Sequence, residues 1–376
     1  MSALSGVRVL ELEAKGPAPF GVMLLADLGA EVIRVDRIRN SPSEKPAAGA
    51  IERGRRSIAI DLKQEAGLAV LLELVAVADV LVEGYRPGIA ERLGFGPDAC
   101  LDRNPRLVYA RMTGWGQDGP LAQRAGHDIN YLALAGALYP LGSADRPPAP
   151  PLNLVGDFGG GGPFLAIGIL AALFERERSG RGQVVDAAMV DGVASMLTAF
   201  HDLRSAGAWT DAREDNLVDG GAPWYRCYAT ADGGFIAVGA LEPSFHRQFL
   251  ERLGLDPEQW PMYDRARWPA QRDKLAALFA TKPRSHWEQL FEESDACVSP
   301  VLTLEESTSA PQLVARDVFV RRNGGFVPQP APRLSRTRPE VAAEPPRPGQ
   351  HTDEVLELLG VSGARREELL SLGVVA

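Results

Sequence analysis

Two short polar segments near the middle of the chain carry the side chains best suited to acid/base chemistry. In the first, Gly126-His127-Asp128-Ile129-Asn130-Tyr131, four hydrogen-bonding side chains crowd five positions. Because imidazole titrates nearest to neutral pH, His127 is a candidate proton donor and acceptor. If the segment opens a helix, His127 and Tyr131 share one face by their i, i+4 spacing, and Asp128 is alternatively a helix cap. The other histidines lie in helical contexts without a catalytic pattern and are interpreted as surface or capping residues: His201, His246, His286 and His351.

The second segment, 153–163, places the carboxylate of Asp157 among five glycines directly before an apolar helix. A helix start presents free N–H groups and the positive end of the helix dipole. Asp157 is therefore interpretable as an ordinary N-cap. Four successive glycines are more than a cap needs, and they suit a backbone that a ligand approaches closely. No GK[ST] follows, which argues against a phosphate-binding P-loop, and the first strand lacks a GxGxxG, which weakens a nicotinamide-binding interpretation.

Basic residues gather in the stretch 34–65, which contains eight lysines and arginines against five acidic residues. The eight are Arg34, Arg37, Arg39, Lys45, Arg53, Arg55, Arg56 and Lys63. Arg86 and Arg92 follow on a later predicted loop. A solvated surface explains any one of them. Several at the strand ends of an α/β sheet, where such folds bind ligands, predict a phosphorylated ligand.

The elements that must position these side chains alternate between strands and helices in the first half of the chain. β-Branched and alternating patterns predict strands at 7–12, 31–35, 57–62, 80–83, 106–112 and 183–189. Apolar spacing predicts helices at 20–28, 64–77, 125–138, 162–178 and 190–206. The alternation predicts an α/β fold with a parallel sheet covered by helices on both faces.

The second half of the chain is predicted to hold a smaller α+β domain. The large domain is expected to occupy 1–206 and the polar, glycine-rich stretch 207–224 to be a linker. A hairpin of strands 224–230 and 234–239 then opens a small domain over 225–305. Seven prolines between 328 and 348 predict an extended return over 306–348. Residues 349–376 are predicted to place a C-terminal helix back on the large domain.

Composition narrows the function classes. The 376 residues are 45% apolar and 24% charged, which fits a globular protein with a substantial core. A net charge of −9 disfavours a chain-wide binding surface for nucleic acid or an anionic membrane. Three widely spaced cysteines, Cys100, Cys227 and Cys297, predict neither a metal site nor a disulfide framework and fit a reducing cytoplasm. No signal peptide and no membrane span are expected.

Taken together, these residues resemble the family III CoA-transferase superfamily and, within it, the racemase branch that acts on α-methylacyl-CoA. The similarity extends over essentially the whole chain. The segments that carry it are Leu4-Ser5-Gly6-Val7-Arg8-Val9-Leu10-Glu11, residues 26–37, Glu83-Gly84-Tyr85-Arg86-Pro87-Gly88, residues 109–117, the His127 and Asp157 segments, Ser179-Gly180-Arg181-Gly182-Gln183, Asp219-Gly220-Gly221-Ala222-Pro223 and residues 295–301.

The resemblance implies roles for individual residues. Asp157 matches the nucleophile of the transferases and an acid/base of the racemases, and His127 matches the partner base of the racemase branch. Glu242 matches a small-domain glutamate that hydrogen-bonds this histidine, and Asn153 matches the residue that supports the aspartate. The positions implied to bind CoA are Arg37, Ala59, Lys63, Arg86 and Arg92, with Tyr131 as a further candidate.

The implied reaction inverts the carbon next to a thioester carbonyl by proton transfer through an enolate. His127 and Asp157 would act from opposite faces of that carbon, and backbone N–H groups near Asp157 would stabilise the enolate oxygen. Asp157 must be protonated when His127 is the base, which requires a raised pKa. No cofactor or metal is expected beyond the CoA of the substrate.

The resemblance also implies an interlocked homodimer built from a large Rossmann-like domain and a small α+β domain. His127 and Asp157 would then come from one subunit, and the other subunit is the candidate source of Glu242. Two other functions stay open at this point. One is CoA transfer between an acyl-CoA and a carboxylic acid with Asp157 as nucleophile, and the other is a CoA-binding scaffold without catalysis.

Overall fold

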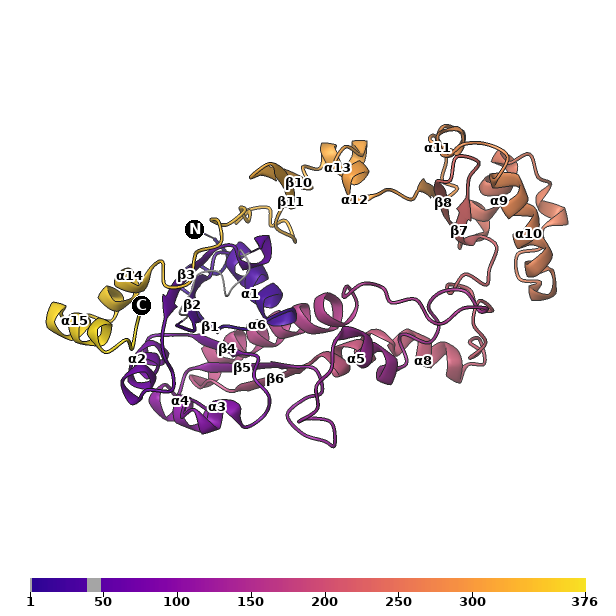
Figure 1. Ribbon diagram of the computed structural model, residues 1–376. Coiled ribbons are helices and arrows are strands. Elements are labelled where there is room, and N and C mark those ends of the chain that lie inside the picture. The colour runs from indigo at the N-terminus through magenta and orange to yellow at the C-terminus, as the bar shows by residue number, and fades with distance from the viewer. Residues whose placement is uncertain (1, 39–48) are drawn as a thin grey trace. The chain divides into compact units, whose positions relative to one another are not determined.

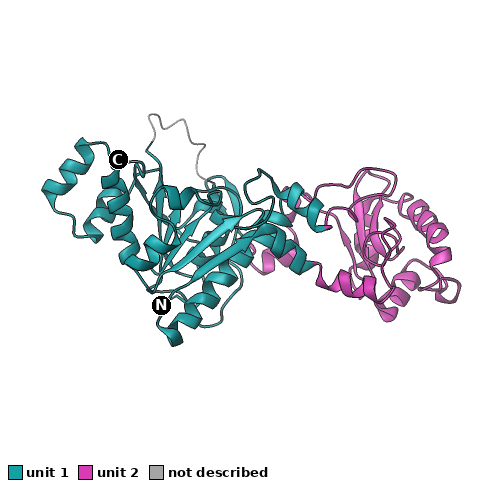
Figure 2. Cartoon of the chain, turned by 90° about the horizontal axis from the view of Figure 1, so that it is seen from below, with its two compact units in different colours: residues 1–135, 152–196, 319–376 teal, residues 136–151, 197–318 magenta. Residues whose placement is uncertain are grey.

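The computed structural model describes residues 2–38 and 49–376, so Arg39 and Lys45 lie outside the described residues. The chain forms two compact units, coloured separately in Figure 2. Unit 1 contains residues 1–135, 152–196 and 319–376, and unit 2 contains 136–151 and 197–318. The division differs from the expected domains, because 136–151 and 197–206 cluster with the second unit.

A six-stranded parallel sheet forms the centre of unit 1, which confirms the predicted α/β class (Figure 1). Its order is β3-β2-β1-β4-β5-β6. The strands are β1 (Arg8–Leu12), β2 (Glu31–Asp36), β3 (Arg55–Ala59), β4 (Val80–Glu83), β5 (Val108–Thr113) and β6 (Val184–Ala188). Chain order reverses between β1 and β4, so this is the switch point at which parallel sheets open a crevice for ligands.

Helices cover both faces of this sheet. They are α1 (Pro17–Asp27), α2 (Glu65–Ala76), α3 (Ile89–Arg92), α4 (Pro97–Arg103), α5 (Asp128–Ala135), α6 (Gly162–Ser179), α7 (Met189–Met196), α14 (Thr352–Leu358) and α15 (Gly363–Ser371). Successive side chains of a strand point to opposite faces. Accordingly Leu10 packs in one core with α2, α4 and the C-terminal helices, and Val9 packs in the other with α1 and α6.

The stretch Gly156–Ser179, which includes α6, is the one described helix long and apolar enough to cross a membrane. Length and composition are weak grounds for a membrane span, because a core helix passes the same test. Here Leu165, Ile169 and Ala172 are buried against the sheet of unit 1. One face of this helix therefore packs on the sheet of an α/β protein.

The return to the large unit is more ordered than the proline content predicts. It contains α12 (Leu304–Ser307), α13 (Pro311–Ala315) and the antiparallel pair β10 (Phe319–Arg322) and β11 (Gly325–Pro328). The remaining segment is held on the sheet edge by the backbone of Gly54, which donates to Ala343 O at 2.7 Å, and by Ser57 Oγ, which accepts from Gly349 N at 2.9 Å. The expected single C-terminal helix is instead α14 and α15.

Unit 2 is built on an antiparallel sheet of β7 (Tyr225–Ala229), β8 (Phe235–Gly239) and β9 (Val298–Pro300). The expected hairpin is its first half. Helices α9 (Pro243–Arg252), α10 (Trp268–Phe279) and α11 (Arg284–Phe291) pack on this sheet around a largely aromatic core. The helix predicted over 190–206 is interrupted at Leu197, where α7 ends and α8 (Thr198–Ser205) begins.

The stretch 207–224 is a hydrogen-bonded loop rather than a free linker. Asn216 is 1% exposed, and its side chain accepts from Thr210 N at 2.8 Å and donates to Thr210 O, Ala212 O and Asp219 Oδ2. Arg272 donates to the carbonyls of Glu214 and Gly221. A buried amide with every group bonded fixes the loop conformation.

His246 is buried, which corrects its interpretation as a surface or capping residue. It is 7% exposed and packs edge-on against Trp224, with ring centroids 5.0 Å apart. Burial disfavours the charged imidazolium and lowers the pKa of His246 to about 4. Helical spacing alone does not distinguish this core position from a surface position.

The buried His246 predicts an acid-sensitive unit 2. The unfolded chain takes up a proton near pH 6.5 and the folded chain only near 4, so stability is complete above 6.5 and is lost as the pH falls toward 4. Between pH 7.5 and 5 we expect on the order of 2 kcal/mol of this loss. Urea unfolding followed by tryptophan fluorescence should show a smaller loss in H246Q, and an unchanged loss would contradict the prediction. The control is H201Q at an exposed position of the same unit.

Candidate active site

A cavity of about 810 Å³ opens in unit 1 at the carboxyl ends of the sheet strands. The loops that follow β1, β4 and β5 form its walls, and these strands flank the switch point of the sheet. His127, Tyr131 and Asp157 complete the lining. The cavity therefore lies where a parallel α/β sheet is expected to bind its ligand, and both proton-transfer candidates are among its lining residues.

His127 lies immediately before α5 and is held there by its backbone. Its N–H donates to Asn130 Oδ1 at 3.0 Å, and its carbonyl accepts from Asn130 N at 2.8 Å. This reciprocal pair fixes the start of α5, and among the described residues the His127 imidazole has no hydrogen-bond partner. Asn130 is a positioning residue that the sequence interpretation did not single out, although its i, i+3 spacing from His127 was visible.

Tyr131 is 5% exposed and lines the same cavity as His127. Its ring meets Trp115 edge-on, with centroids 4.7 Å apart. A Cβ atom at Gly114 would lie 2.1 Å from Tyr131 Cζ, and one at Gly126 would lie 2.8 Å from its Cε1. Any larger residue at these two positions would clash with the Tyr131 ring, so glycine is needed there.

Asp157 stands in a six-residue π-helical turn, η3 (Gly156–Gly161), that precedes α6. Asn153 Nδ2 donates to Asp157 Oδ2 at 3.0 Å. A Cβ atom at Gly16, where φ is 66°, would lie 3.1 Å from the same oxygen. Burial is the largest cause of the raised pKa of Asp157, with the nearby Asp128 charge adding to it, while the Asn153 hydrogen bond and His127 oppose it. The direction is the one that a carboxyl proton donor near neutral pH requires.

The glycines after Asp157 serve helix packing rather than ligand approach. A Cβ atom at Gly160 would lie 2.8 Å from Val193 N, and one at Gly162 would lie 2.9 Å from Pro17 O. Gly161 is equally confined by Pro17 and Met189. None of these three glycines is among the cavity-lining residues. The expectation of a ligand-facing glycine backbone is thus wrong for this part of the segment.

The backbone N–H groups around Asp157 are already occupied. Asp157 N donates to Asp128 Oδ2 at 2.8 Å, Phe158 N to Asn153 O at 3.3 Å and Gly160 N to Val155 O at 2.8 Å. These donors cannot also stabilise an enolate oxygen without losing those bonds. The expected source of oxyanion stabilisation is therefore corrected for these three amides.

The residues predicted to bind CoA divide into two groups. Arg37 and Arg86 line the cavity with Tyr131. Ala59, at the end of β3, is buried against the C-terminal segment and accepts from Ala376 N at 3.1 Å. Lys63 and Arg92 are exposed and do not line the cavity. For these three the assigned contact with CoA stays a prediction.

Much of the basic stretch 34–65 is neutralised within the fold. Arg55 Nε donates to Glu11 Oε2 at 2.7 Å, and both side chains are at most 1% exposed. The other internal pairs are Arg34 with Asp36 and Glu52, Arg53 with Asp27, and Arg56 with Glu31. Charge counting therefore overstates the basic edge, and among the described basic residues of that stretch Arg37 is the one that lines the cavity.

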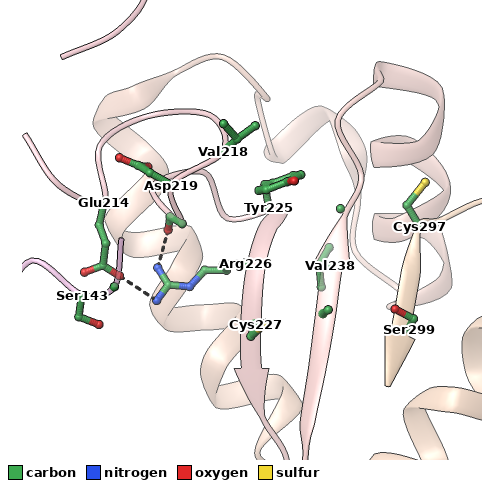
Figure 3. A pocket seen from close by; sticks show the side chains of 14 residues that line it. Ser143, Glu214, Val218, Asp219, Tyr225, Arg226, Cys227, Val238, Cys297 and Ser299 are labelled. Atoms are coloured by element: carbon green, nitrogen blue, oxygen red, sulfur yellow. Dashed lines mark hydrogen bonds and ion pairs between the residues drawn. The ribbon is translucent and has the colours of Figure 1, made fainter. Parts of the chain in front are cut away.

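Glu242 belongs to unit 2, where it occupies the N-cap position of α9. Unit 2 also has a cavity of its own, of about 600 Å³, shown in Figure 3. The Arg226 side chain in its lining is engaged internally, because it donates to Gly220 O at 2.8 Å and to Glu214 Oε1 at 3.3 Å. Its lining contains no histidine, so the acid/base pair lies in the cavity of unit 1.

Comparison with known proteins agrees with this architecture. A model of CoA-transferase family III matches residues 4–352. The chain is 47% identical to the α-methylacyl-CoA racemase of Mus musculus and 45% identical to that of Homo sapiens, and each alignment covers 98% of this chain and 96% of the relative. The crystal structure of Rv3272 from M. tuberculosis superposes with a TM-score of 0.78 at 28% identity, covering 94% of this chain and 98% of that one.

Proposed function

The chain belongs to CoA-transferase family III, and from this membership we propose that it is an α-methylacyl-CoA racemase that inverts C2 of 2-methyl-branched acyl-CoA thioesters. The observation that carries the proposal is the placement of His127 and Asp157 in the wall of one cavity. A racemase that uses two acid/base groups needs both at the same substrate carbon. The relatives named as racemases match nearly the full chain.

Proton transfer at C2 proceeds in two steps. In one direction His127 removes the C2 proton and a protonated Asp157 delivers a proton to the opposite face, and the other enantiomer reverses these roles. The raised pKa of Asp157 supports its role as donor, because the carboxyl group then stays protonated to higher pH. Asn153 orients the Asp157 carboxyl through its 3.0 Å hydrogen bond.

The enolate oxygen requires donors other than the occupied amides near Asp157. The first N–H groups of a helix have no acceptor within the helix, and α5 begins at Asp128, next to His127. The amides of Asp128 and Ile129 are therefore the proposed donors, helped by the positive end of the α5 dipole.

CoA binding is assigned to the basic and aromatic side chains around the cavity, Arg37, Arg86 and Tyr131. Lys63, Arg92 and the backbone at Ala59 are proposed as contacts farther along the nucleotide. No cofactor and no metal are proposed, since proton transfer next to a thioester needs only bases and oxyanion donors.

A homodimer is part of the proposal. Unit 1 exposes apolar side chains on neighbouring surface elements: Leu134 on α5, Ile167 and Phe174 on α6, and Val184 on the edge strand β6. A second subunit would cover such side chains. Glu242 would then hydrogen-bond His127 and hold one of its tautomers. A cytoplasmic location is proposed, because Cys227 and Cys297 are exposed thiols without a disulfide.

Isotope exchange tests the proposed function directly. Incubation with 2-methylacyl-CoA thioesters in heavy water should place deuterium at C2 and convert either enantiomer to the same mixture. Proton NMR and chiral chromatography of the product measure both events. Absence of exchange with branched fatty acyl, sterol side-chain and aryl-propionyl thioesters would exclude the racemase function.

CoA transfer is the alternative, because Asp157 in the cavity wall is also placed to attack a thioester carbonyl. Such an enzyme would form an acyl-Asp157 anhydride and release CoA thiolate, which then attacks the Asp157 carbonyl, frees the donor acid and leaves an Asp157–CoA thioester. The second carboxylate displaces CoA from Asp157, and the thiolate attacks the acyl carbonyl of the new anhydride to give the second acyl-CoA and free Asp157. Hydroxylamine should then trap the acyl group, and His127 would be dispensable.

A further inference from the structure

Asp128 is a buried carboxylate that the proposed reaction does not use. It is 7% exposed and lies at the first position of α5, directly after His127 in the chain. Its Oδ2 accepts from Asp157 N at 2.8 Å. Within the described residues its Oδ1 is buried and has no hydrogen-bond partner. A buried carboxylate oxygen without a donor is costly and calls for an explanation.

The ordinary explanation for an acidic residue in a first helical turn is capping of its own helix. Here the side chain bonds the backbone of another element, the π-helical turn that carries Asp157. The Asp128 carboxylate packs closely against the π-helical turn, because a Cβ atom at Gly156 would lie 2.4 Å from Asp128 Oδ2. The contact therefore fixes the entry of Asp157 into its turn rather than the start of α5.

The second consequence of the contact is electrostatic. A negative group beside a carboxyl disfavours its ionised form. Burial is the largest cause of the raised pKa of Asp157 and of Tyr131, and the Asp128 charge raises both further. Opposing the rise at Asp157 are the Asn153 hydrogen bond and His127. The other charged and titratable side chains of the cavity are Glu13, Lys15, Arg37, Tyr85, Arg86 and Arg124.

We propose that Asp128 is a positioning residue for Asp157: it anchors the Asp157 amide and biases a proton onto the Asp157 carboxyl group. The assignment rests on the proposed racemase function, in which Asp157 must alternate between proton donor and acceptor. Asp128 itself does not touch the reacting carbon. A low-dielectric site strengthens such an influence between neighbouring charges.

Two variants separate the anchor from the charge. D128N keeps an oxygen that accepts from Asp157 N and removes the negative charge, whereas D128A removes both. The full-length protein carrying aspartate labelled with carbon-13 at its carboxyl carbon is titrated by NMR, and D157N assigns the Asp157 signal. We expect the Asp157 titration to move to lower pH in D128N, and D98N, at an exposed first-turn aspartate of α4, serves as the matched control.

The kinetic counterpart is a change that depends on pH. In D128N kcat/KM for racemisation should fall about tenfold at pH 8 for both enantiomers, because an equilibrium constant near one requires the same loss in both directions and Asp157 is then protonated in a smaller share of the enzyme. If Asp128 has only a structural role, the titration of Asp157 will be unchanged in D128N and the thermal stability of D128A will be lower. That result would overturn the proposal. The titration needs no substrate, so it is decided even if the exchange test excludes racemase activity.

Discussion

Replacing His127 with alanine is expected to lower the rate of racemisation by about 10²–10⁴-fold for both enantiomers. Each inversion needs one group to remove the C2 proton and another to replace it on the opposite face, so the loss of either group stops the cycle. The remaining acid/base group, Asp157, lies in the same cavity. H127A should therefore still exchange the C2 proton of the one enantiomer that presents it to Asp157, without inverting that carbon.

Chiral chromatography measures the loss of inversion, and proton NMR in heavy water measures the residual exchange. The matched control is H201A, because His201 lies on the exposed surface of unit 2. Wild-type racemisation in H127A would contradict the assignment of His127. Equal residual exchange of both enantiomers would contradict the two-face mechanism.

Replacing Asp157 with asparagine is expected to cause a loss of similar size, with the opposite residual pattern. Asparagine can still accept from Asn153 Nδ2, so the local geometry is retained, but it cannot carry the transferred proton. D157N should exchange only the enantiomer that presents its C2 proton to His127. The crossed pattern of H127A and D157N would assign one face of the substrate to each residue.

The same variant separates the racemase from the transferase. In a transferase, D157N loses acyl transfer because the nucleophile is gone, and hydroxylamine captures an acyl group from the wild-type protein but not from D157N. H127A would then be as active as the wild type. For the racemase we expect no hydroxylamine-sensitive acyl-protein in any of the three proteins, measured by mass spectrometry of the intact chain.

The sheet could be predicted from the sequence because its strands are buried on both faces. Val80-Leu81-Val82 is apolar without alternation, which is typical of a parallel strand covered by helices. Helix boundaries were harder to predict. Apolar spacing continues through Leu197, and nothing local indicates that α7 ends there and the second unit begins.

The sequence was sufficient to predict which residues belong to the candidate site, but not which contacts they make. His127, Asn153 and Asp157 could be singled out from the sequence, but the π-helical turn could not, because a run of glycines has no side-chain pattern. The contact of Asp128 with Asp157 N joins residues 29 positions apart. Ion pairs such as Arg55 with Glu11 are likewise tertiary, so local charge counting cannot recognise them.

The buried positions of Val355, Leu356, Leu369, Val374 and Val375 bear on how the chain folds during synthesis. These residues complete the core that also contains Leu10, Ile33 and Ile58, and Ile60 pairs with Val375 across the sheet edge. A ribosome must therefore deliver almost the whole chain before this core is complete. The aromatic core of unit 2 is drawn entirely from residues 217–298 and needs no such delay. Unit 2 is thus expected to fold first. The apolar side chains of the N-terminal third stay exposed during synthesis and are available for chaperones to bind.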